Sequence, residues 1–333
     1  MRAWVVERPG PIEGGPLKLV DRDAPSPGPG DVRVRIAVCG VCRTDLHLAE
    51  GDLPPHHPEV VPGHEIVGRV DAVGVGVERF AFGDRLGIAW LRHTDGLCRF
   101  CLRGDENLCL SPGFTGWDAD GGYTEAAVVD ERYAYRVPDD FSDEEAAPLL
   151  CAGIIGYRAL KQSRLPPGGR LGIYGFGASA HLTAQIAEAQ GAAVHVVTRG
   201  AAAQRLALEL GAEWAGGLDD VPPAPLDAAI LFAPVGDMVL PALAALDRGA
   251  TLAVAGIHLT DVPALSYERH LFEERSLTSV TANTRADGEE LLRVAARVRP
   301  RVATQPYPLE HADEALTDLA RDRINGVAVL RVA

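Results

Sequence analysis

The sequence has no excess of basic residues and no long apolar run. It has 32 Lys and Arg against 46 Asp and Glu, a formal net charge of −14. Nucleic acids and anionic membranes attract basic surfaces, so we expect neither to be the main partner. No apolar run reaches the roughly 18 residues of a spanning helix, and the first segment, MRAWVVERPG, lacks the apolar core of a signal peptide. We therefore expect a soluble, cytoplasmic protein.

A disordered composition and internal repeats are absent as well. Apolar residues make up 47% and charged residues 23%, which is the mix of a globular chain that buries a core. The length of 333 residues exceeds the roughly 250 residues of most single cores, so we expect two domains.

Cysteine is scarce and unevenly placed. The six cysteines are Cys39, Cys42, Cys98, Cys101, Cys109 and Cys151. In a long chain without an export signal, cysteines more often serve metal binding or catalysis than disulfides. The crowding of Cys98, Cys101 and Cys109 into one short segment indicates metal binding.

The first 150 residues are rich in Gly and Pro and contain short β-type runs. The clearest runs are Val32 to Val38, Ile66 to Val73 and Ala126 to Val129. Closely spaced turn signals, such as the segment PSPGPG at 25–30, favour an all-β barrel or sandwich.

From about residue 153 the pattern changes to alternating strands and helices. The expected strands are Leu171 to Tyr174, Ala193 to Thr198, Ala228 to Phe232 and Thr251 to Ala255, and the helices between them include Ala178 to Gln190 and Ala202 to Leu210. Short apolar runs between helices are typical of buried parallel strands. The alternation predicts right-handed βαβ units and a doubly wound sheet.

The C-terminal segment predicts two helices and a strand. The helices are Gly288 to Val298 and Ala312 to Arg321, and the strand is Gly326 to Val332. We assign this segment to the first domain.

A glycine-rich motif follows the first strand of the second domain. Gly175-Phe176-Gly177-Ala178-Ser179-Ala180 reads G-x-G-x-x-A between a strand and a helix. Such glycines allow close approach of a dinucleotide pyrophosphate to a helix N-terminus. The alternative is a glycine turn that only packs the helix on the strand.

The end of the next strand bears on the choice of cofactor. An NAD-selective site places a carboxylate there to bind the ribose 2′-hydroxyl, but this strand ends in Thr198-Arg199-Gly200. Arg199 could face a 2′-phosphate, which favours NADP(H) over NAD. The alternative is a solvated arginine in an enzyme that uses either cofactor.

Cys98-x2-Cys101-x7-Cys109 has the spacing of a structural zinc loop. Such sites have four ligands, and the matching fourth position upstream is Asp95, whose carboxylate can bind zinc. His93 is the other candidate. The alternative is three reduced cysteines without a metal.

A second group of metal-binding residue types is dispersed along the chain. It comprises Cys42, His64 with Glu65, and Cys151. Two cysteines and a histidine with one open position make a catalytic zinc set. Spacing alone does not link residues so far apart, and Cys151 by itself would be interpreted as a buried apolar thiol.

Five motifs occur in an order that resembles the zinc-dependent medium-chain alcohol dehydrogenases of the medium-chain dehydrogenase/reductase superfamily. They are GVCRTDLH at 40–47, PGHE at 62–65, the cysteine loop, LCAG at 150–153, and Gly175-x-Gly177. The resemblance covers nearly the whole chain. It implies an α/β plus β protein with a GroES-like β-barrel catalytic domain (1–152 and 285–333) and an inserted doubly wound Rossmann nucleotide-binding domain (153–284).

The resemblance also implies roles for residues around a catalytic zinc. Cys42, His64 and Cys151 would be its ligands, with Asp45 orienting His64 and Glu65 beside the metal. Thr44 would place a hydroxyl next to the substrate oxygen, and His47 would pass its proton to solvent, unless His47 is a surface histidine.

Cofactor and substrate positions follow from the same resemblance. The implied cofactor-binding residues are Arg43 at the pyrophosphate, Gly175, Gly177, Ala178, Ser179, Thr198, Arg199 and Ile257. Leu53 and Trp90 fall where the family lines its substrate pocket, the alternative being ordinary core residues.

Several positions depart from the family pattern. Asp95 stands where the structural loop usually begins with cysteine, and Val327 stands where many relatives have a second pyrophosphate-binding arginine. Cys39 has no family ligand role and is interpreted as a packed thiol. His56 and His57 are interpreted as loop histidines.

We expect a reversible hydride transfer between a primary aliphatic or aromatic alcohol and NAD(P), with a catalytic and a structural zinc, about two per chain. The bulky Trp90 predicts a narrow pocket that disfavours wide secondary alcohols. The family implies a homodimer or homotetramer. The alternatives are a zinc-free quinone or enone reductase of the same superfamily and a non-enzymatic nucleotide-binding zinc protein.

Overall fold

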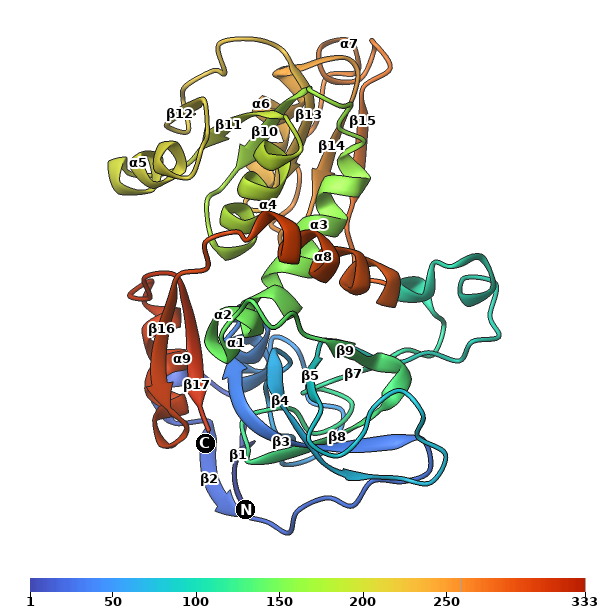
Figure 1. Cartoon of the computed structure of the whole chain (residues 1–333). Helices are drawn as coiled ribbons and strands as arrows, with labels where there is room; N and C mark the ends of the chain where they lie inside the picture. The colour runs from blue at the N-terminus through green and yellow to red at the C-terminus, as the bar shows by residue number, and fades with distance from the viewer. Residues whose placement is uncertain (258, 333) are drawn as a thin grey trace. The chain divides into compact units, whose positions relative to one another are not determined.

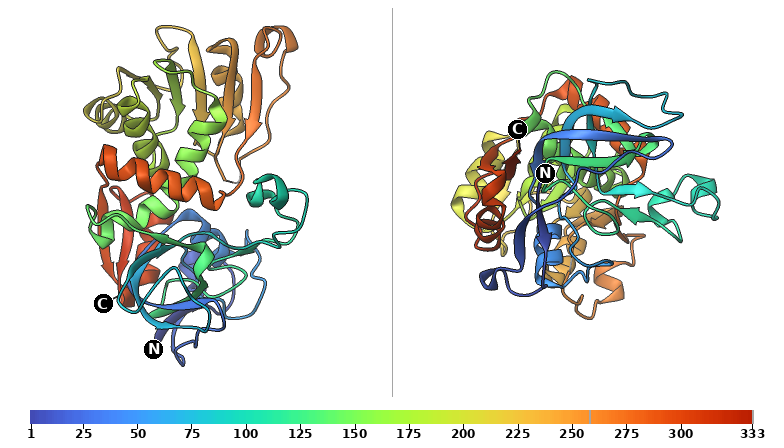
Figure 2. Two further views of the ribbon diagram at one scale, coloured as in Figure 1. Left: turned by 45° about the vertical axis from the view of Figure 1, so that its right-hand side comes forward. Right: turned by 90° about the horizontal axis from the view of Figure 1, so that it is seen from below.

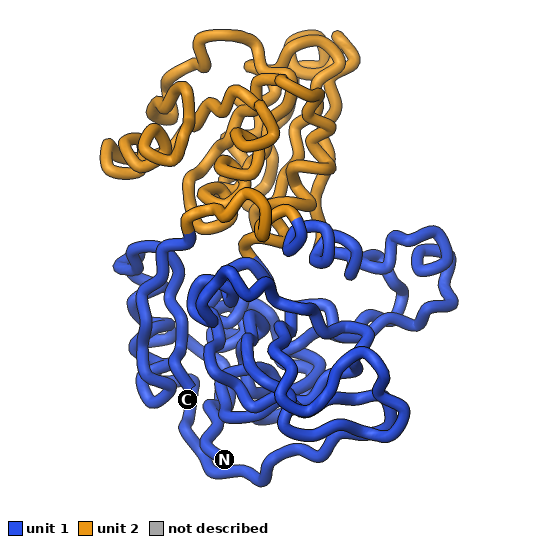
Figure 3. Tube along the Cα trace, in the orientation of Figure 1, with its two compact units in different colours: residues 1–151, 282–293, 302–333 blue, residues 152–281, 294–301 orange. Residues whose placement is uncertain are grey.

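The computed structural model describes residues 1–257 and 259–332. The chain forms two compact units (Figure 3). The first comprises Met1–Cys151, Ala282–Arg293 and Val302–Ala333, and the second Ala152–Thr281 and Val294–Arg301. The expected domains, 1–152 with 285–333 and 153–284, stay a prediction. The units place residue 152 in the second unit, 282–284 in the first and 294–301 in the second.

The first unit is built on antiparallel strands. Its main sheet has the order β16-β17-β3-β4-β5-β9, and β8 also pairs with β3 (Figure 1). The strands are β3 (Asp31–Gly40), β4 (Ile66–Val73), β5 (Arg85–Ile88), β8 (Ala126–Asp130), β9 (Ala134–Arg136), β16 (Thr304–Pro308) and β17 (Val327–Arg331). Two separate pairs are β1 (Arg2–Val6) with β2 (Leu17–Asp21), and β6 (Leu91–His93) with β7 (Gly113–Phe114).

Alternation along β3 explains why this sheet has a buried face. Val32, Val34 and Ile36 are fully buried, whereas Arg33 and Arg35 between them reach the surface. Successive side chains of a strand point to opposite faces, so every second residue enters the core. The helices of this unit are α1 (Arg43–Glu50), α2 (Asp143–Ala146) and α9 (Ala312–Ala320).

The second unit is a six-stranded parallel sheet with the order β12-β11-β10-β13-β14-β15 (Figures 1 and 2). Its strands are β10 (Arg170–Tyr174), β11 (Ala193–Val197), β12 (Trp214–Gly216), β13 (Leu226–Leu231), β14 (Leu246–Val254) and β15 (Ser276–Ser279). Its helices are α3 (Ala152–Ser163), α4 (Ala178–Ala189), α5 (Ala201–Glu209), α6 (Val239–Ala244) and α7 (Tyr267–His270). Numbered from β10, the order is 3-2-1-4-5-6, which is that of a Rossmann nucleotide-binding fold. The expected fold class is therefore confirmed.

Helix α8 (Arg285–Val298) begins in the first unit and ends in the second. It starts three residues before the helix expected at Gly288. Thr284 and Asp287 exchange hydrogen bonds at this end, the Asp287 N–H to Thr284 Oγ1 at 3.1 Å and the Thr284 N–H to Asp287 Oδ2 at 3.0 Å. This reciprocal capping lets the helix begin earlier than its apolar pattern.

The remaining sequence-predicted strands and helices are present with ends shifted by a few residues. The short elements β5, β9, β12 and β16 have no counterpart among the expected ones, because a strand of three to five residues carries too little periodicity to be recognised. None of the helices formed by the described residues has the length and apolar character needed to cross a bilayer.

Candidate functional site

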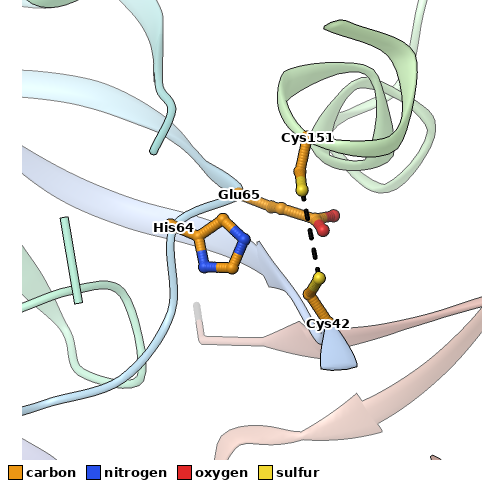
Figure 4. Close-up of side chains that lie close together, drawn as sticks. All are labelled: Cys42, His64, Glu65 and Cys151. Carbon is orange, nitrogen blue, oxygen red and sulfur yellow. Dashed lines mark hydrogen bonds between the residues drawn. The ribbon is translucent and has the colours of Figure 1, made fainter. Parts of the chain in front are cut away.

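The structure gathers four metal-binding side chains from distant parts of the first unit (Figure 4). Cys42 precedes helix α1, His64 and Glu65 precede strand β4, and Cys151 ends the segment before helix α3. One ligand atom from each lies within 4.8 Å of the others. We call these residues the buried cluster; the sequence pattern alone does not link them.

Asp45 holds the buried cluster in place. Its carboxylate is 2% exposed and accepts hydrogen bonds from Cys42 N (2.9 Å), Gly63 N (3.0 Å), His64 Nδ1 (3.1 Å) and Tyr123 Oη (3.2 Å). Because His64 donates from Nδ1, its Nε2 remains available as a ligand atom. The bond from Cys42 N also caps helix α1, so one carboxylate fixes both the helix and the histidine.

The two thiols of the cluster lie at a distance that suits zinc. Cys42 Sγ and Cys151 Sγ are 3.9 Å apart. Two sulfurs bound to one tetrahedral zinc at 2.3 Å lie about 3.8 Å from each other. Hydrogen bonding between them lowers the pKa of Cys42 and raises that of Cys151. Burial lowers the pKa of His64, but the charge and hydrogen bond of Asp45 outweigh it and raise that pKa on balance.

Glu65 is a buried carboxylate beside these ligands. It is 2% exposed, and its Oε2 has no hydrogen-bond partner among the described residues. Burial raises the pKa of Glu65 well above its usual value. A Cβ at Gly40 would lie 2.0 Å from Glu65 Oε2, so only glycine leaves room for this side chain. An unpartnered buried carboxylate oxygen next to two thiols and an imidazole fits a cation site.

A second group lies in the segment 95–109, which we call the metal loop. Ligand atoms of Asp95, Cys98, Cys101 and Cys109, the loop cluster, lie within 4.8 Å of one another. The Asp95 Oδ1 atom accepts the N–H groups of Leu97 and Cys98, each at 2.8 Å. These bonds hold the pKa of Asp95 well below its usual range. The structure therefore places Asp95, rather than His93, with the three cysteines.

Helix α1 also carries the residues expected to act on the substrate proton and the cofactor. The Cys42 thiol lies 3.8 Å from Thr44 Oγ1, and one turn later His47 Nδ1 lies 3.0 Å from Asp52 Oδ2. The guanidinium of Arg43 is exposed and pairs with Asp322. Leu53 is half-buried, and its N–H donates to the carbonyl of His47.

Trp90 borders the buried cluster as part of an aromatic wall. Its ring lies 5.0 Å from the His64 ring, edge to face, and stacks on Phe114 (4.9 Å) and Trp117 (6.0 Å). The sequence reasoning did not select Phe114 or Trp117. Their position in the glycine-rich segment 112–122, shortly after the metal loop, is the signal that could have indicated them.

The two glycines of the motif in the second unit have different surroundings. Gly175 has φ of +88°, and a Cβ there would lie 2.8 Å from Ala233 N. A Cβ at Gly177 would contact nothing within 4 Å, and this glycine caps α4, which begins at Ala178 and Ser179. The helix N-terminus is thus accessible to a phosphate. Near the end of β11, Thr198 is buried and Arg199 exposed, and Ile257 is 52% exposed.

The remaining candidates lie outside both clusters. Cys39 is fully buried and its thiol donates to the carbonyl of Gly40. His56 pairs with Asp118, and His57 Nδ1 lies 3.2 Å from the carbonyl of Pro58. Val327 pairs with Thr304 in the sheet.

A zinc-like buried cluster in an antiparallel β unit, in a chain that also forms a Rossmann unit, is the combination of a metal- and nucleotide-dependent oxidoreductase. Residues 28–139 match the alcohol dehydrogenase GroES-like domain. Over its whole length the chain is 59% identical to the probable alcohol dehydrogenase AdhA of Mycobacterium tuberculosis (strain CDC 1551 / Oshkosh), 97% of which it covers. The chain belongs to the zinc-dependent medium-chain alcohol dehydrogenase family.

Solved structures agree with this assignment. An NAD-dependent alcohol dehydrogenase has a TM-score of 0.89 and 26% identity, with 100% of each chain covered. The Helicobacter pylori CAD complexed with NADP(H) has a TM-score of 0.87 and 26% identity, with 99% of each chain covered. The protein is thus an alcohol dehydrogenase, an oxidoreductase acting on CH–OH groups, and the two alternatives considered from the sequence are set aside.

Proposed function

We propose that the chain oxidises primary alcohols reversibly to aldehydes with a zinc ion held by Cys42, His64 and Cys151. The observation that carries the proposal is the 3.9 Å separation of Cys42 Sγ and Cys151 Sγ beside a histidine oriented by Asp45. A second zinc would be held by Asp95, Cys98, Cys101 and Cys109. Bound in the first set, zinc would supply Lewis acidity that lowers the pKa of the substrate hydroxyl, and the nicotinamide cofactor would supply the hydride acceptor.

The residues of helix α1 would handle the proton. Thr44 presents its hydroxyl on the side of Cys42, where it can accept the proton of the substrate hydroxyl. His47, one turn along the same helix, is paired with Asp52 and would receive that proton and pass it to solvent. Glu65 would lie beside the zinc ligands as the second carboxylate of the site after Asp45. The exposed Arg43 would give up its ion pair with Asp322 and bind the cofactor pyrophosphate.

Metal content and turnover test this assignment together. Purified protein should contain about two zinc ions per chain and should reduce NAD or NADP with primary alcohols. Protein that carries no zinc yet turns over at full rate would contradict the proposal.

The aromatic wall would set the preference for primary and aromatic substrates. Trp90, Phe114 and Trp117 form a flat stack beside His64. A planar aryl group can stack on such a wall, whereas the second alkyl branch of a secondary alcohol would meet Trp90. Benzyl alcohol and ethanol should therefore be oxidised faster than 2-butanol, and Trp90→Ala should narrow the difference. Faster oxidation of 2-butanol by the wild type would overturn this preference.

We propose NADP(H) as the preferred cofactor. The second strand of the Rossmann unit ends in Thr198-Arg199 without a carboxylate, and Arg199 is exposed there. A 2′-phosphate would gain from the guanidinium charge. Replacing Arg199 with Ala should raise the KM for NADP about tenfold and leave that for NAD within about twofold. Equal kcat/KM for both cofactors in the wild type would contradict the preference.

We also propose a homo-oligomer, a dimer or tetramer, formed through the second unit. Strand β15 is the last strand of the sheet, and apolar side chains near it are exposed: Tyr267 at 65%, Phe272 at 62% and Leu277 at 40%. Uncovered strand edges with apolar neighbours tend to pair. Sedimentation of the wild type should give more than one chain per particle, and Leu277→Lys should reduce that number. A monomer at all concentrations would contradict it.

A further inference from the structure

A buried carboxylate of the metal loop contacts the first residue of helix α8. Glu106 is 9% exposed and lies in a short turn, Glu106–Leu108, between Cys101 and Cys109. Its Oε1 accepts the backbone N–H of Arg285 at 2.6 Å and Arg285 Nε at 3.0 Å, and its Oε2 accepts an Arg285 NH2 group at 2.7 Å. Such pairing offsets the cost of burying a charged carboxylate.

The bond to the Arg285 backbone adds to the capping of α8. The first N–H groups of a helix have no partner within it. Thr284 and Asp287 satisfy one of them at this end, as described above, and Glu106 satisfies the N–H of Arg285 from a segment 179 residues away. The negative charge of Glu106 also lies at the positive end of the helix dipole.

The other end of the metal loop is attached to the same place. Thr94, directly before Asp95, donates its N–H to Tyr133 Oη at 2.9 Å. The guanidinium of Arg285 lies 4.8 Å from the centre of the Tyr133 ring. Tyr133 therefore links the residue before the metal loop, Thr94, to the start of α8, and Glu106 within the loop contacts that start directly.

The metal loop is shaped by hydrogen bonds of its own turns and has few buried apolar side chains. Leu97 is 81% exposed and Leu102 is 74% exposed, so these leucines add nothing to a core. A segment with few buried apolar contacts gains further order when it binds a metal, as small zinc domains do. The position of Glu106, eight residues from the Asp95–Cys98 end of the loop, depends on that shape.

We propose that Glu106 is a positioning residue that couples ligation of the metal loop to the start of helix α8. When the loop cluster is ligated, Glu106 stands at the N-terminus of α8 and orders its first turn. Because α8 continues into the second unit, the metal loop thereby fixes the beginning of a segment that enters the nucleotide-binding unit. The proposal rests on the second zinc site proposed above.

Hydrogen–deuterium exchange of the zinc-loaded full-length enzyme tests the coupling. Glu106→Gln removes the charge but keeps the size of the side chain, and amides 285–288 should exchange at least tenfold faster while zinc content stays at the wild-type value. Cys101→Ser should accelerate the same amides and lower zinc content by about one per chain. The matched control is Asp105→Asn, since Asp105 lies in the same loop but pairs with Arg103 within it; its exchange should stay within twofold of wild type.

The double variant Glu106→Gln/Cys101→Ser separates coupling from two independent losses. If the metal acts on α8 through Glu106, the double variant exchanges no faster than the faster single variant. Multiplied effects, or a Glu106→Gln protein within twofold of wild type, would overturn the proposal. The proposed function would still stand if the wild-type enzyme oxidises alcohols and binds two zinc ions. Wild-type protein without zinc in the metal loop would overturn both this proposal and the second zinc site.

Discussion

The buried cluster and the loop cluster have similar ligand chemistry but opposite construction. The buried cluster joins residues from 42 to 151 and includes two side chains, His64 and Glu65, that are at most 2% exposed. The loop cluster spans only 95–109, and three of its four members are partly exposed. One is organised by a buried carboxylate, Asp45, and the other by backbone N–H groups of its own turns.

This difference shows how one fold separates reactivity from stability. When the ligands come from distant segments, the surrounding strands and helices hold each of them in place. A metal can then keep one coordination position free for the substrate inside a buried site. A short loop closes around its metal with four protein ligands and has no such position. We therefore expect substitutions in the buried cluster to lower the turnover rate. Substitutions in the loop cluster should instead lower the stability of the fold.

The largest effect is expected for Cys42→Ser. Loss of Lewis-acid stabilisation amounts to several kcal/mol, so kcat should fall by about 1000-fold or more. Zinc content should drop by about one ion per chain while the circular dichroism spectrum stays that of wild type. A Cys42→Ser protein with full kcat would show that the buried cluster is not the catalytic zinc site.

Asp45→Asn is expected to have the next largest effect. The change weakens the acceptor of four hydrogen bonds, including that from His64, and loss of such an orienting group typically costs 10- to 100-fold in metal affinity or activity. Steady-state kinetics and zinc titration measure both. Wild-type values for both would mean that His64 does not depend on Asp45 for its orientation.

Asp95→Ala should affect the loop cluster and spare turnover. Without its fourth ligand the loop should hold zinc more weakly, and the free energy of unfolding should fall by about 1–3 kcal/mol. At 25 °C kcat should stay within about twofold of wild type. Asp95→Cys, which would give the loop four thiolates, is the matched control and should retain the metal. Full zinc retention in Asp95→Ala would assign the fourth ligand elsewhere.

Cys39→Ala should have the smallest effect. It tests whether a cysteine close to Cys42 in the sequence takes part in zinc binding when it lies outside both clusters. Cys39 is fully buried near Cys42 but belongs to neither cluster. A small cavity should lower the free energy of unfolding by about 1 kcal/mol with zinc content and kcat unchanged, as denaturant titration and metal analysis would show. Loss of zinc in this variant would make Cys39 a ligand.

Local patterns were sufficient to predict the loop cluster and the glycine motif, because their members lie within a few turns of one another. The strands β3, β4 and β10 and the helices α4 and α9 were also predicted, since each is long enough to show its period or is bounded by clear turns. The aromatic wall was only partly predicted: Trp90 was selected, but its stacking on Phe114 and Trp117 depends on how β6 and β7 pair. The contact of Glu106 with α8 joins residues 179 positions apart and leaves no local pattern.

The sequence by itself determined the ligand types and the order of the motifs. It also determined the two patterns, short β-type runs and alternating strands and helices, that correspond to the antiparallel sheet and the Rossmann sheet. These properties follow from side-chain chemistry and from short-range periodicity. Local patterns did not bring Cys42, His64 and Cys151 together; the family resemblance implied that they share one site, and the tertiary structure shows it. Only the tertiary structure decided which groups Asp45 holds, among them Cys42 N and His64 Nδ1, and that Glu106 caps a distant helix. The physical reason is that each of these contacts is strong only because several segments of the chain exclude water from it. The sequence of one segment does not show which other segments will cover its polar groups.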